Sequence, residues 1–290
     1  MQRLLGLLLL LGTTLPALAQ VASLVHKEEK RRYLVYTPPA YASQPTASFA
    51  VVFNFHGGGM TMAEQMLYTG MNRAADRHGF IVVYPAGLKQ DWNVGFGMSY
   101  TEGADDIGFV QALLAKLKGE YRIDPQRVYA TGLSRGGFFA QRIAAELPHL
   151  FAAVASVGAP LPEPVGQHHG NPGRVGVLLI HGSADQVVAY DGKATGYLSA
   201  PASYDYWRQH NGIAGAGSSR VIDTSGTDGT SVTWHETDEG PYRVALATVR
   251  NGGHTWPGAD PFNVGLPIGK TTADIDGNDV IWGFLARHRR

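Results

Sequence analysis

Three polar residues, far apart in the chain, have the types and the surroundings needed for nucleophilic attack on a carbonyl carbon. Ser134 lies in Gly-Leu-Ser-Arg-Gly, Asp185 in His-Gly-Ser-Ala-Asp, and His254 in Asn-Gly-Gly-His-Thr-Trp. A serine hydroxyl becomes a good nucleophile when an imidazole removes its proton, and the imidazole needs a carboxylate to fix its tautomer and stabilise its charged form. The sequence therefore predicts Ser134 as nucleophile, His254 as base and Asp185 as acid.

Glycines stand two residues before and two residues after Ser134. This spacing suits a sharp strand-to-helix turn in which a serine adopts a strained backbone and a larger flanking residue would collide with the opposite limb. The segment Arg127–Thr131 reads as a short strand, and the residues after Ser134 place small side chains on one helical face. The alternative is a small residue in an ordinary glycine-rich turn, but the flanking elements favour the catalytic turn.

The acid and the base each have a competitor in the sequence. Asp185 follows the expected strand Val175–Ile180, although an aspartate can also serve a turn, and Asp191 is a second candidate acid. His254 combines a late position, a strand end and a run of glycines, whereas His235 lies within an apparent strand, from which reach to a loop is poor. We therefore expect Asp185 and His254.

Acyl transfer also needs donors directed at the oxygen that becomes negative, and fixed backbone N–H groups serve best. The N–H of Arg135, directly after the serine, is one candidate donor. The second is expected from Gly58, Gly59 or Met60 in the loop that follows the strand Ala50–Phe55. No Gly-Lys-Ser/Thr follows these glycines, so the loop does not read as a phosphate-binding loop.

Aromatic and charged residues near these motifs could form the substrate pocket. Trp92 and Trp256 could wall an apolar pocket; ordinary packing explains Trp92 equally well and explains Trp256, two residues from His254, less well. The Arg135 side chain could meet an acidic or hydroxylated substrate or could be a solvated helix residue. His168-His169 alone is too little for a metal site, and Asp105-Asp106 reads as a helix cap.

Buried-strand and helix patterns alternate along the chain. Helical spacing is expected near 62–77, from Asp105 to before Asp124, near 204–210 and over 279–287 with Asp276 or Asn278 as cap. Strands are expected at Arg31–Tyr36 (an edge strand), Ala50–Phe55, Phe80–Tyr84, Arg127–Thr131, Phe151–Val157, Val175–Ile180 and Tyr242–Val249. This alternation predicts an α/β fold with a mainly parallel sheet covered by helices on both faces.

No internal repeat or linker divides the chain, so residues 20–290 are expected to form one domain. The interval between Phe151–Val157 and Val175–Ile180 is too short for a helical lid domain, and we expect an open cleft. Residues 1–19 carry one charge, an apolar run and a final Ala-Leu-Ala, which is typical of a cleavable signal peptide. A secreted or periplasmic location without a membrane anchor is therefore expected.

The chain has 24 basic and 24 acidic residues and no cysteine. This balance offers no footprint for nucleic acid, and no such partner is expected. The absence of cysteine excludes disulfides, thiolate catalysis and thiolate metal sites. The sequence does not indicate an oligomeric state.

The motifs together resemble the esterase family that includes extracellular polyhydroxybutyrate depolymerases and bacterial feruloyl and acetylxylan esterases. The segments that carry the resemblance are His56–Gly59, Trp92-Asn93, Ala104–Phe109, the turn from Gly132 to Gly137, His181–Asp185 and Gly253–Gly258. The resemblance implies an α/β-hydrolase fold, a Ser134–Asp185–His254 triad, secretion, and no metal or organic cofactor. Its implied partner is a small-molecule or oligomeric ester.

The chain departs from this family in three ways. Many members carry disulfides near the Trp92 loop, polymer-degrading members often add a polymer-binding module, and a small or apolar residue is expected where Arg135 stands. The second departure favours soluble hydroxyalkanoate or similar esters as substrates. Feruloyl or acetylxylan esters remain the alternative, and a non-catalytic binding protein on a hydrolase fold is a third interpretation.

Overall fold

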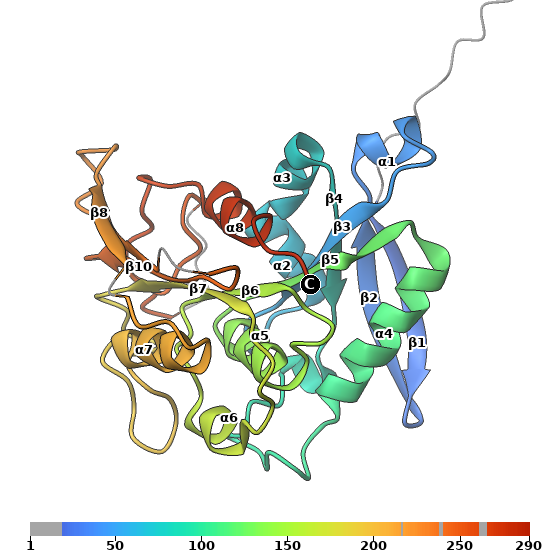
Figure 1. The fold of residues 1–290 in the computed structure, drawn as a ribbon, viewed down its shortest axis with the longest axis horizontal. Coiled ribbons are helices and arrows are strands. Elements are labelled where there is room, and N and C mark those ends of the chain that lie inside the picture. Colours follow the sequence, from blue (N-terminus) through green and yellow to red (C-terminus); the bar gives the residue numbers. More distant parts are fainter. Residues whose placement is uncertain (1–18, 216, 238–239, 261–265) are drawn as a thin grey trace, which may run out of the picture.

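A mixed β-sheet with helices packed on both faces organises the molecule (Figure 1). The computed structural model describes residues 19–215, 217–237, 240–260 and 266–290. The expected signal peptide, 1–19, therefore lies outside the described residues except at its last position. The described chain forms one ten-stranded sheet, in the order β1-β2-β4-β3-β5-β6-β7-β10-β9-β8.

The strands at the centre of the sheet run parallel, and those at its two edges run antiparallel. The parallel set is β4-β3-β5-β6-β7-β10, while β1, β2, β8 and β9 pair antiparallel. The strand bounds are β1 Gln20–His26, β2 Glu29–Tyr36, β3 Phe49–Phe55, β4 Phe80–Pro85, β5 Ile123–Leu133, β6 Ala153–Val157, β7 Gly176–Gly182, β8 Ser218–Ile222, β9 Ser231–Glu236 and β10 Val244–Arg250.

Helices cover the two faces of the sheet in separate groups (Figure 1). Buried residues of α4, α5, α6 and α7 join one apolar cluster, and those of α2, α3 and α8 join the other. The helix bounds are α1 Pro39–Ser43, α2 Met62–Thr69, α3 Met71–His78, α4 Asp106–Glu120, α5 Arg135–Glu146, α6 Glu163–His168, α7 Ala200–His210 and α8 Gly277–Leu285, with a 3₁₀ turn at Leu88–Gln90.

Strand β3 shows why the central strands read as unbroken apolar runs. All seven of its residues are buried, because an inner parallel strand is covered on both faces. Val51, Phe53 and Phe55 pack into the cluster of α4 and α5, whereas Ala50 and Val52 pack into the cluster of α2 and α3. The carboxyl end of this strand is thereby fixed between two cores.

Several sequence expectations are confirmed and several are wrong. Asp105 and Asp276 cap α4 and α8 as expected, each accepting backbone N–H bonds. The single helix expected over 62–77 is two helices, because Gly70 adopts a left-handed φ of 59° between α2 and α3. The strand expected at the edge, β2, is second from the edge, since β1 pairs outside it.

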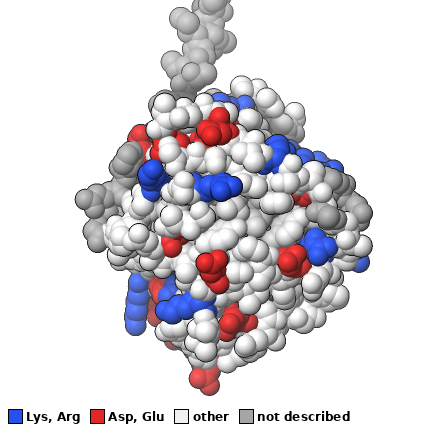
Figure 2. All heavy atoms as spheres, turned by 90° about the vertical axis from the view of Figure 1, so that its left-hand side faces the viewer, with Lys and Arg blue, Asp and Glu red and all other residues white. Residues whose placement is uncertain are grey.

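None of the helices among the described residues has the length and apolarity that crossing a bilayer requires. On the face shown in Figure 2, acidic and basic side chains are interspersed and no large patch of one sign appears. The interval between β6 and β7 holds only the six-residue α6, as expected for a cleft without a helical lid domain there.

Candidate active site

Ser134 is the single residue between β5 and α5. Its backbone has φ 54° and ψ −120°, a strained conformation for a side-chain-bearing residue, and its N–H donates to the Val157 carbonyl at 2.8 Å. Such strain persists only where the surroundings enforce it. The serine is thereby held half-buried, with its hydroxyl at the carboxyl edge of the sheet.

The two glycines that flank the serine are required by close backbone contacts. A Cβ placed on Gly132 would come within 2.5 Å of the Gly136 backbone, and one placed on Gly136 would come within 2.1 Å of the Phe55 carbonyl oxygen. Real Cβ atoms do not approach other atoms so closely. The Gly-x-Ser-x-Gly spacing therefore reflects how tightly β5, α5 and β3 meet.

Asp185 and His254 come together from loops that follow β7 and β10. His254 Nδ1 lies 2.7 Å from Asp185 Oδ2, and both side chains are buried. The other carboxylate oxygen, Oδ1, accepts the N–H groups of Val187 and Val188 at 2.8 Å each. Asp191, the competing acid, is exposed and, among the described residues, has no bond to His254. His235 lies on β9.

Asp185 is ionised through contacts that overcome its burial. Burial alone raises its pKa, but hydrogen bonds from His181 and His254 and the charge of His254 outweigh that effect and hold the pKa of Asp185 well below its ordinary value. His181 Nε2 lies 3.3 Å from the same Oδ2 and 2.8 Å from the Val188 carbonyl oxygen. A second imidazole thus supports the carboxylate, which the sequence reasoning did not predict.

Backbone hydrogen bonds join the loop that carries His254 to the segment 268–270. Gly253 donates to the Lys270 carbonyl at 2.9 Å, and His254 donates to the Ile268 carbonyl. A Cβ on Gly253 would come within 1.9 Å of that Ile268 oxygen, so only glycine fits there. The glycine run before His254 lets two stretches of backbone approach closely.

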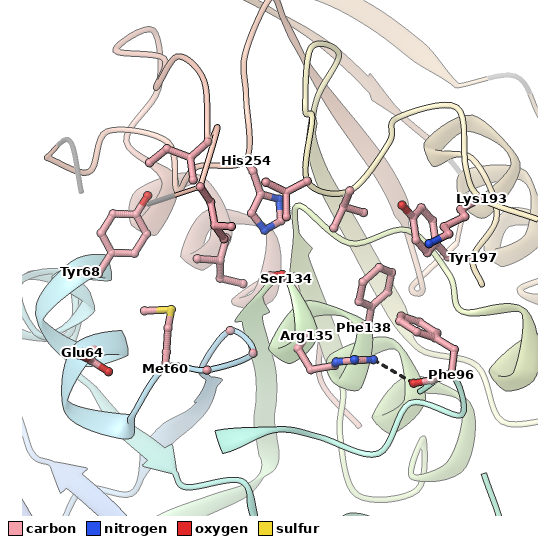
Figure 3. A pocket seen from close by; sticks show the side chains of 18 residues that line it. Met60, Glu64, Tyr68, Phe96, Ser134, Arg135, Phe138, Lys193, Tyr197 and His254 are labelled. Carbon is pink, nitrogen blue, oxygen red and sulfur yellow. Dashed lines mark hydrogen bonds between the residues drawn. The ribbon is translucent and has the colours of Figure 1, made fainter. Parts of the chain in front are cut away.

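Ser134 and His254 both line one cavity of 590 Å³ (Figure 3). In this view the His254 ring stands above Ser134 with a nitrogen directed toward it. Within the described residues no hydrogen bond joins the Ser134 hydroxyl to the imidazole. Such contacts are commonly long in free hydrolases and shorten when substrate binds.

The backbone donors beside Ser134 narrow the choice of an oxyanion site. Gly59 N–H donates to the Gln90 carbonyl at 2.8 Å and Met60 N–H to the Gly57 carbonyl at 3.1 Å, so both are occupied. The N–H groups of Gly58 and Arg135 have no acceptor among the described residues. A Cβ on Gly58 would lie 3.6 Å from Arg135 Cβ, so the two segments are adjacent.

The loop that presents Gly58 is supported from below by buried groups. His56 Nε2 accepts the Gly87 N–H at 2.9 Å, so its Nδ1 carries the proton and donates to the Gly57 carbonyl at 2.8 Å. Burial lowers the pKa of His56, which favours this neutral tautomer. Trp92 Nε1 donates to the His56 carbonyl at 3.0 Å.

The structure does not bring Trp92 and Trp256 into the cavity, contrary to the sequence expectation. Both rings are fully buried, and neither lines the cavity. Trp92 stacks on Phe139 at 5.0 Å between ring centres and meets Phe55 edge to face. The indole Nε1–H of Trp256 donates to Asn278 Oδ1, and its backbone N–H donates to the Tyr68 hydroxyl. The two tryptophans support cavity walls without forming them.

The cavity has two unlike halves on either side of Ser134 and His254 (Figure 3). On one side lie Met60, Glu64 and Tyr68. On the other side lie three aromatic and two basic residues: Phe96, Phe138, Tyr197, Arg135 and Lys193. Sequence reasoning missed these aromatic residues, because nothing in their spacing separates a cavity wall from core packing.

The Arg135 side chain is committed to neighbours. Its Nε pairs with Asp91 at 2.8 Å, Nη1 donates to the Phe96 carbonyl at 3.1 Å, and the guanidinium lies 4.6 Å from the Phe96 ring centre. Arg135 therefore holds the loop bearing Phe96 against the start of α5. In the described part of the chain no group of histidine and acidic side chains could hold a metal ion.

Comparison with known families gives a match over more than half of the chain, including Ser134 and Asp185 but not His254. The family model described as "Esterase PHB depolymerase" matches residues 31–202. A curated protein of Nocardia uniformis subsp. tsuyamanensis, named "Putative esterase NocK", is 31% identical over 280 residues, covering 88% of this chain and 79% of its own length. "Feruloyl esterase B" of Piromyces equi is 26% identical, covering 77% of this chain and 42% of its own length.

Solved structures show the same fold. The acetyl xylan esterase from Aspergillus awamori matches with a TM-score of 0.62 at 16% identity, covering 92% of this chain and 99% of that one. A thermostable esterase matches with a TM-score of 0.61 at 17% identity, covering 94% of this chain and 63% of that one. The α/β-hydrolase fold and the family resemblance expected from the sequence are confirmed.

Proposed function

Because the chain belongs to the esterase PHB depolymerase family, we propose that it is a serine carboxylic ester hydrolase that works through an acyl-enzyme at Ser134. The observation that carries this proposal is the 2.7 Å bond between His254 Nδ1 and Asp185 Oδ2, with the imidazole above a strained, accessible Ser134. Nucleophile, acid and base occur in the chain order Ser134, Asp185, His254, as in α/β-hydrolases generally.

The chemistry assigned to each residue follows from its contacts. His254 takes the proton of Ser134 as the hydroxyl oxygen attacks the ester carbonyl, and Asp185 stabilises the resulting imidazolium. The N–H groups of Arg135 and Gly58 stabilise the negative oxygen. The alcohol leaves with the proton from His254, and a water activated by His254 then releases the acid from Ser134.

Soluble hydroxyalkanoate or similar esters are the substrates that we propose first. The cavity supports a short ester, since 590 Å³ is the size of a small-molecule site and apolar side chains such as Met60, Phe96 and Phe138 form part of its lining. Feruloyl or acetylxylan esters are the alternative, which relatives with those names and the aromatic wall of Phe96, Phe138 and Tyr197 support.

The test is Ser134→Ala, a change that removes the nucleophile and leaves the backbone able to fold. We expect turnover of an aryl butyrate to fall at least about 10⁴-fold, with unfolding midpoints unchanged, and we expect a fluorophosphonate to label the native protein stoichiometrically at Ser134. A binding protein on the same fold would remain unlabelled. Residual turnover by the variant near the native rate would remove the proposal.

Export through the leader at residues 1–19 belongs to the same proposal. Expression of the full chain with its leader in a bacterial host is expected to yield a protein outside the cytoplasm that begins near Gln20. N-terminal sequencing of that fraction measures it. An uncleaved protein in the cytoplasm would contradict export without affecting the catalytic proposal.

A further inference from the structure

We propose that Lys193 binds an ionised carboxylate on the substrate, so that the preferred substrates are short esters carrying a free acid group beyond the scissile bond. This inference rests on the proposed ester hydrolase function, because it names the class of ester that the same cavity takes. Three observations support it: which charged side chains of the cavity lining have ion-pair partners, the backbone hydrogen bonds that fix Lys193, and the aromatic wall between Ser134 and Lys193.

Lys193 lines the cavity, is exposed, and has no ion-pair partner among the described residues. Its ammonium has no ion pair and no side-chain hydrogen bond among the described residues. Arg135, the other cation of the lining, is paired with Asp91 at 2.8 Å. Within the described lining, Lys193 is therefore the group available to an anion.

The backbone that carries Lys193 is fixed, so its side chain starts from a defined place. Lys193 N–H donates to the Tyr197 carbonyl at 2.9 Å, and its own carbonyl accepts the N–H groups of Gly196 and Tyr197 at 3.0 and 3.1 Å. Tyr197 is buried, and its hydroxyl accepts the Ala189 N–H at 3.1 Å. In Figure 3 the ammonium is turned toward the cavity.

An aromatic wall lies between Ser134 and Lys193. The rings of Phe96 and Phe138 meet edge to face at 5.0 Å between centres, and Phe138 and Tyr197 lie 5.2 Å apart. These rings offer apolar area to the carbon chain of a substrate while its polar end continues to the ammonium. Hydrocarbon contact followed by a cation suits a short chain that ends in a carboxylate.

The opposite half of the cavity disfavours the reversed orientation. Glu64 lines that half, and its Oε2 accepts the Thr61 N–H at 2.7 Å within the capping box of α2. This bond holds the Glu64 carboxylate near the cavity, where it repels the carboxylate of a substrate bound in the reversed orientation. A substrate anion is thus directed to the Lys193 side.

The charge pattern discriminates between the ester classes considered for this site. A soluble hydroxyalkanoate oligomer ends in a free carboxylate, whereas an acetyl group on a neutral polysaccharide brings no charge. The pattern therefore favours esters of hydroxy acids over acetylated xylan.

The experiment compares one pair of substrates, the dimer of 3-hydroxybutyrate as free acid and its methyl ester. Cleavage of the internal ester forms the same hydroxybutyryl-enzyme from both substrates and releases 3-hydroxybutyrate from the acid and its methyl ester from the other. The rates are therefore measured by the release of these two leaving groups, and the difference in kcat/KM at that bond reports the acylation step. The native protein, Lys193→Gln and Lys193→Glu are compared, with Lys30→Gln on the exposed hairpin β1–β2 as matched control.

We expect the ratio of kcat/KM, acid over methyl ester, to fall about 3- to 10-fold in Lys193→Gln and further in Lys193→Glu, because a partly solvated charge pair contributes modestly. Lys30→Gln is expected to keep the native ratio. Raising the salt concentration is expected to lower the native ratio and to leave that of Lys193→Gln nearly constant.

The outcomes separate this inference from the proposed function. If the methyl ester is hydrolysed in a Ser134-dependent way but the ratio does not respond to Lys193, the carboxylate assignment is wrong and the hydrolase proposal remains. If neither ester, nor any aryl ester, is hydrolysed above the Ser134→Ala background, the hydrolase proposal itself fails.

Discussion

Gly158 lies against the imidazole of His254, because a Cβ built on it would come within 3.0 Å of Nδ1, the atom bonded to Asp185. Gly158 also has a left-handed φ of 60° and donates its N–H to the Ile180 carbonyl at 2.8 Å. The end of β6 thus forms the floor on which the proposed base rests.

Gly158→Ala is expected to lower kcat/KM for an aryl ester about 10- to 100-fold, because the methyl group displaces the imidazole and the left-handed backbone costs about 1 kcal/mol. Steady-state kinetics and the rate of fluorophosphonate labelling measure this effect. Gly170→Ala is the control, since a Cβ there meets open space at an ordinary φ. Native kinetics in Gly158→Ala would show that this contact does not position His254.

Gly136→Ala is expected to destabilise the protein severely, by about 3 kcal/mol or more, because its Cβ would overlap the Phe55 carbonyl. Gly283→Ala in α8, where a Cβ meets nothing within 4 Å, is expected to raise the free energy of unfolding by about 0.5–1 kcal/mol. Urea denaturation of both variants measures these opposite signs. Equal effects would contradict the packing argument for the turn.

His181 is a positioning residue for Asp185, through the 3.3 Å contact to Oδ2. His181→Ala is expected to lower kcat about tenfold with KM within about threefold, and His181→Gln, which retains an N–H donor, is expected to recover part of the loss. Because the bond from His181 lowers the pKa of Asp185, its loss also moves that pKa upward. A change in KM alone would argue against this role.

Trp92→Phe tests whether this residue supports the oxyanion loop or contacts substrate. The variant loses the bond from Nε1 to the His56 carbonyl and part of a buried ring, so the free energy of unfolding is expected to fall by about 1–3 kcal/mol. KM is expected to stay within about twofold, since the ring does not line the cavity. A large rise in KM with native stability would restore the sequence expectation of a substrate contact.

Acidification is expected to destabilise the fold between about pH 6.5 and pH 4 through a buried histidine. Burial lowers the pKa of His288 to about 4, and its Nε2 accepts the Arg243 N–H at 3.2 Å. The imidazole of His288 is therefore protonated near pH 6.5 in the unfolded chain but only near pH 4 in the folded chain. The free energy of unfolding consequently falls as the pH falls through this window. Urea denaturation at several pH values measures it, and His288→Gln is expected to flatten the slope.

The elements that carry the proposed catalytic residues were predictable because the physical constraint on each was local. Ser134 needs close-packed glycines, and Asp185 and His254 follow strands whose apolar runs are continuous. The break at Gly70 was not predictable, since a glycine is tolerated inside a helical pattern and need not end the helix. Edge strands β1 and β8 contain no fully buried residue and lack the apolar run that marks inner strands.

The substrate side of the site was the least predictable. Trp92 and Trp256 stand next to the motifs of the proposed site, yet burial on all sides places both rings in the core. Phe96, Phe138 and Tyr197 line the cavity because three separate segments meet there, and no pattern within one segment encodes that meeting. Their roles depend on tertiary structure, which local sequence does not contain.

The bond from the Trp256 N–H to the Tyr68 hydroxyl joins the loop of His254 to a wall of the cavity on α2. A mutation of Tyr68 that reshapes this wall for a different acyl group therefore also changes the hydrogen bond to Trp256, two residues after His254. Engineering of chain-length preference at Tyr68 is coupled to turnover, so gains in selectivity there come with losses in rate unless Trp256 is re-anchored by a compensating change.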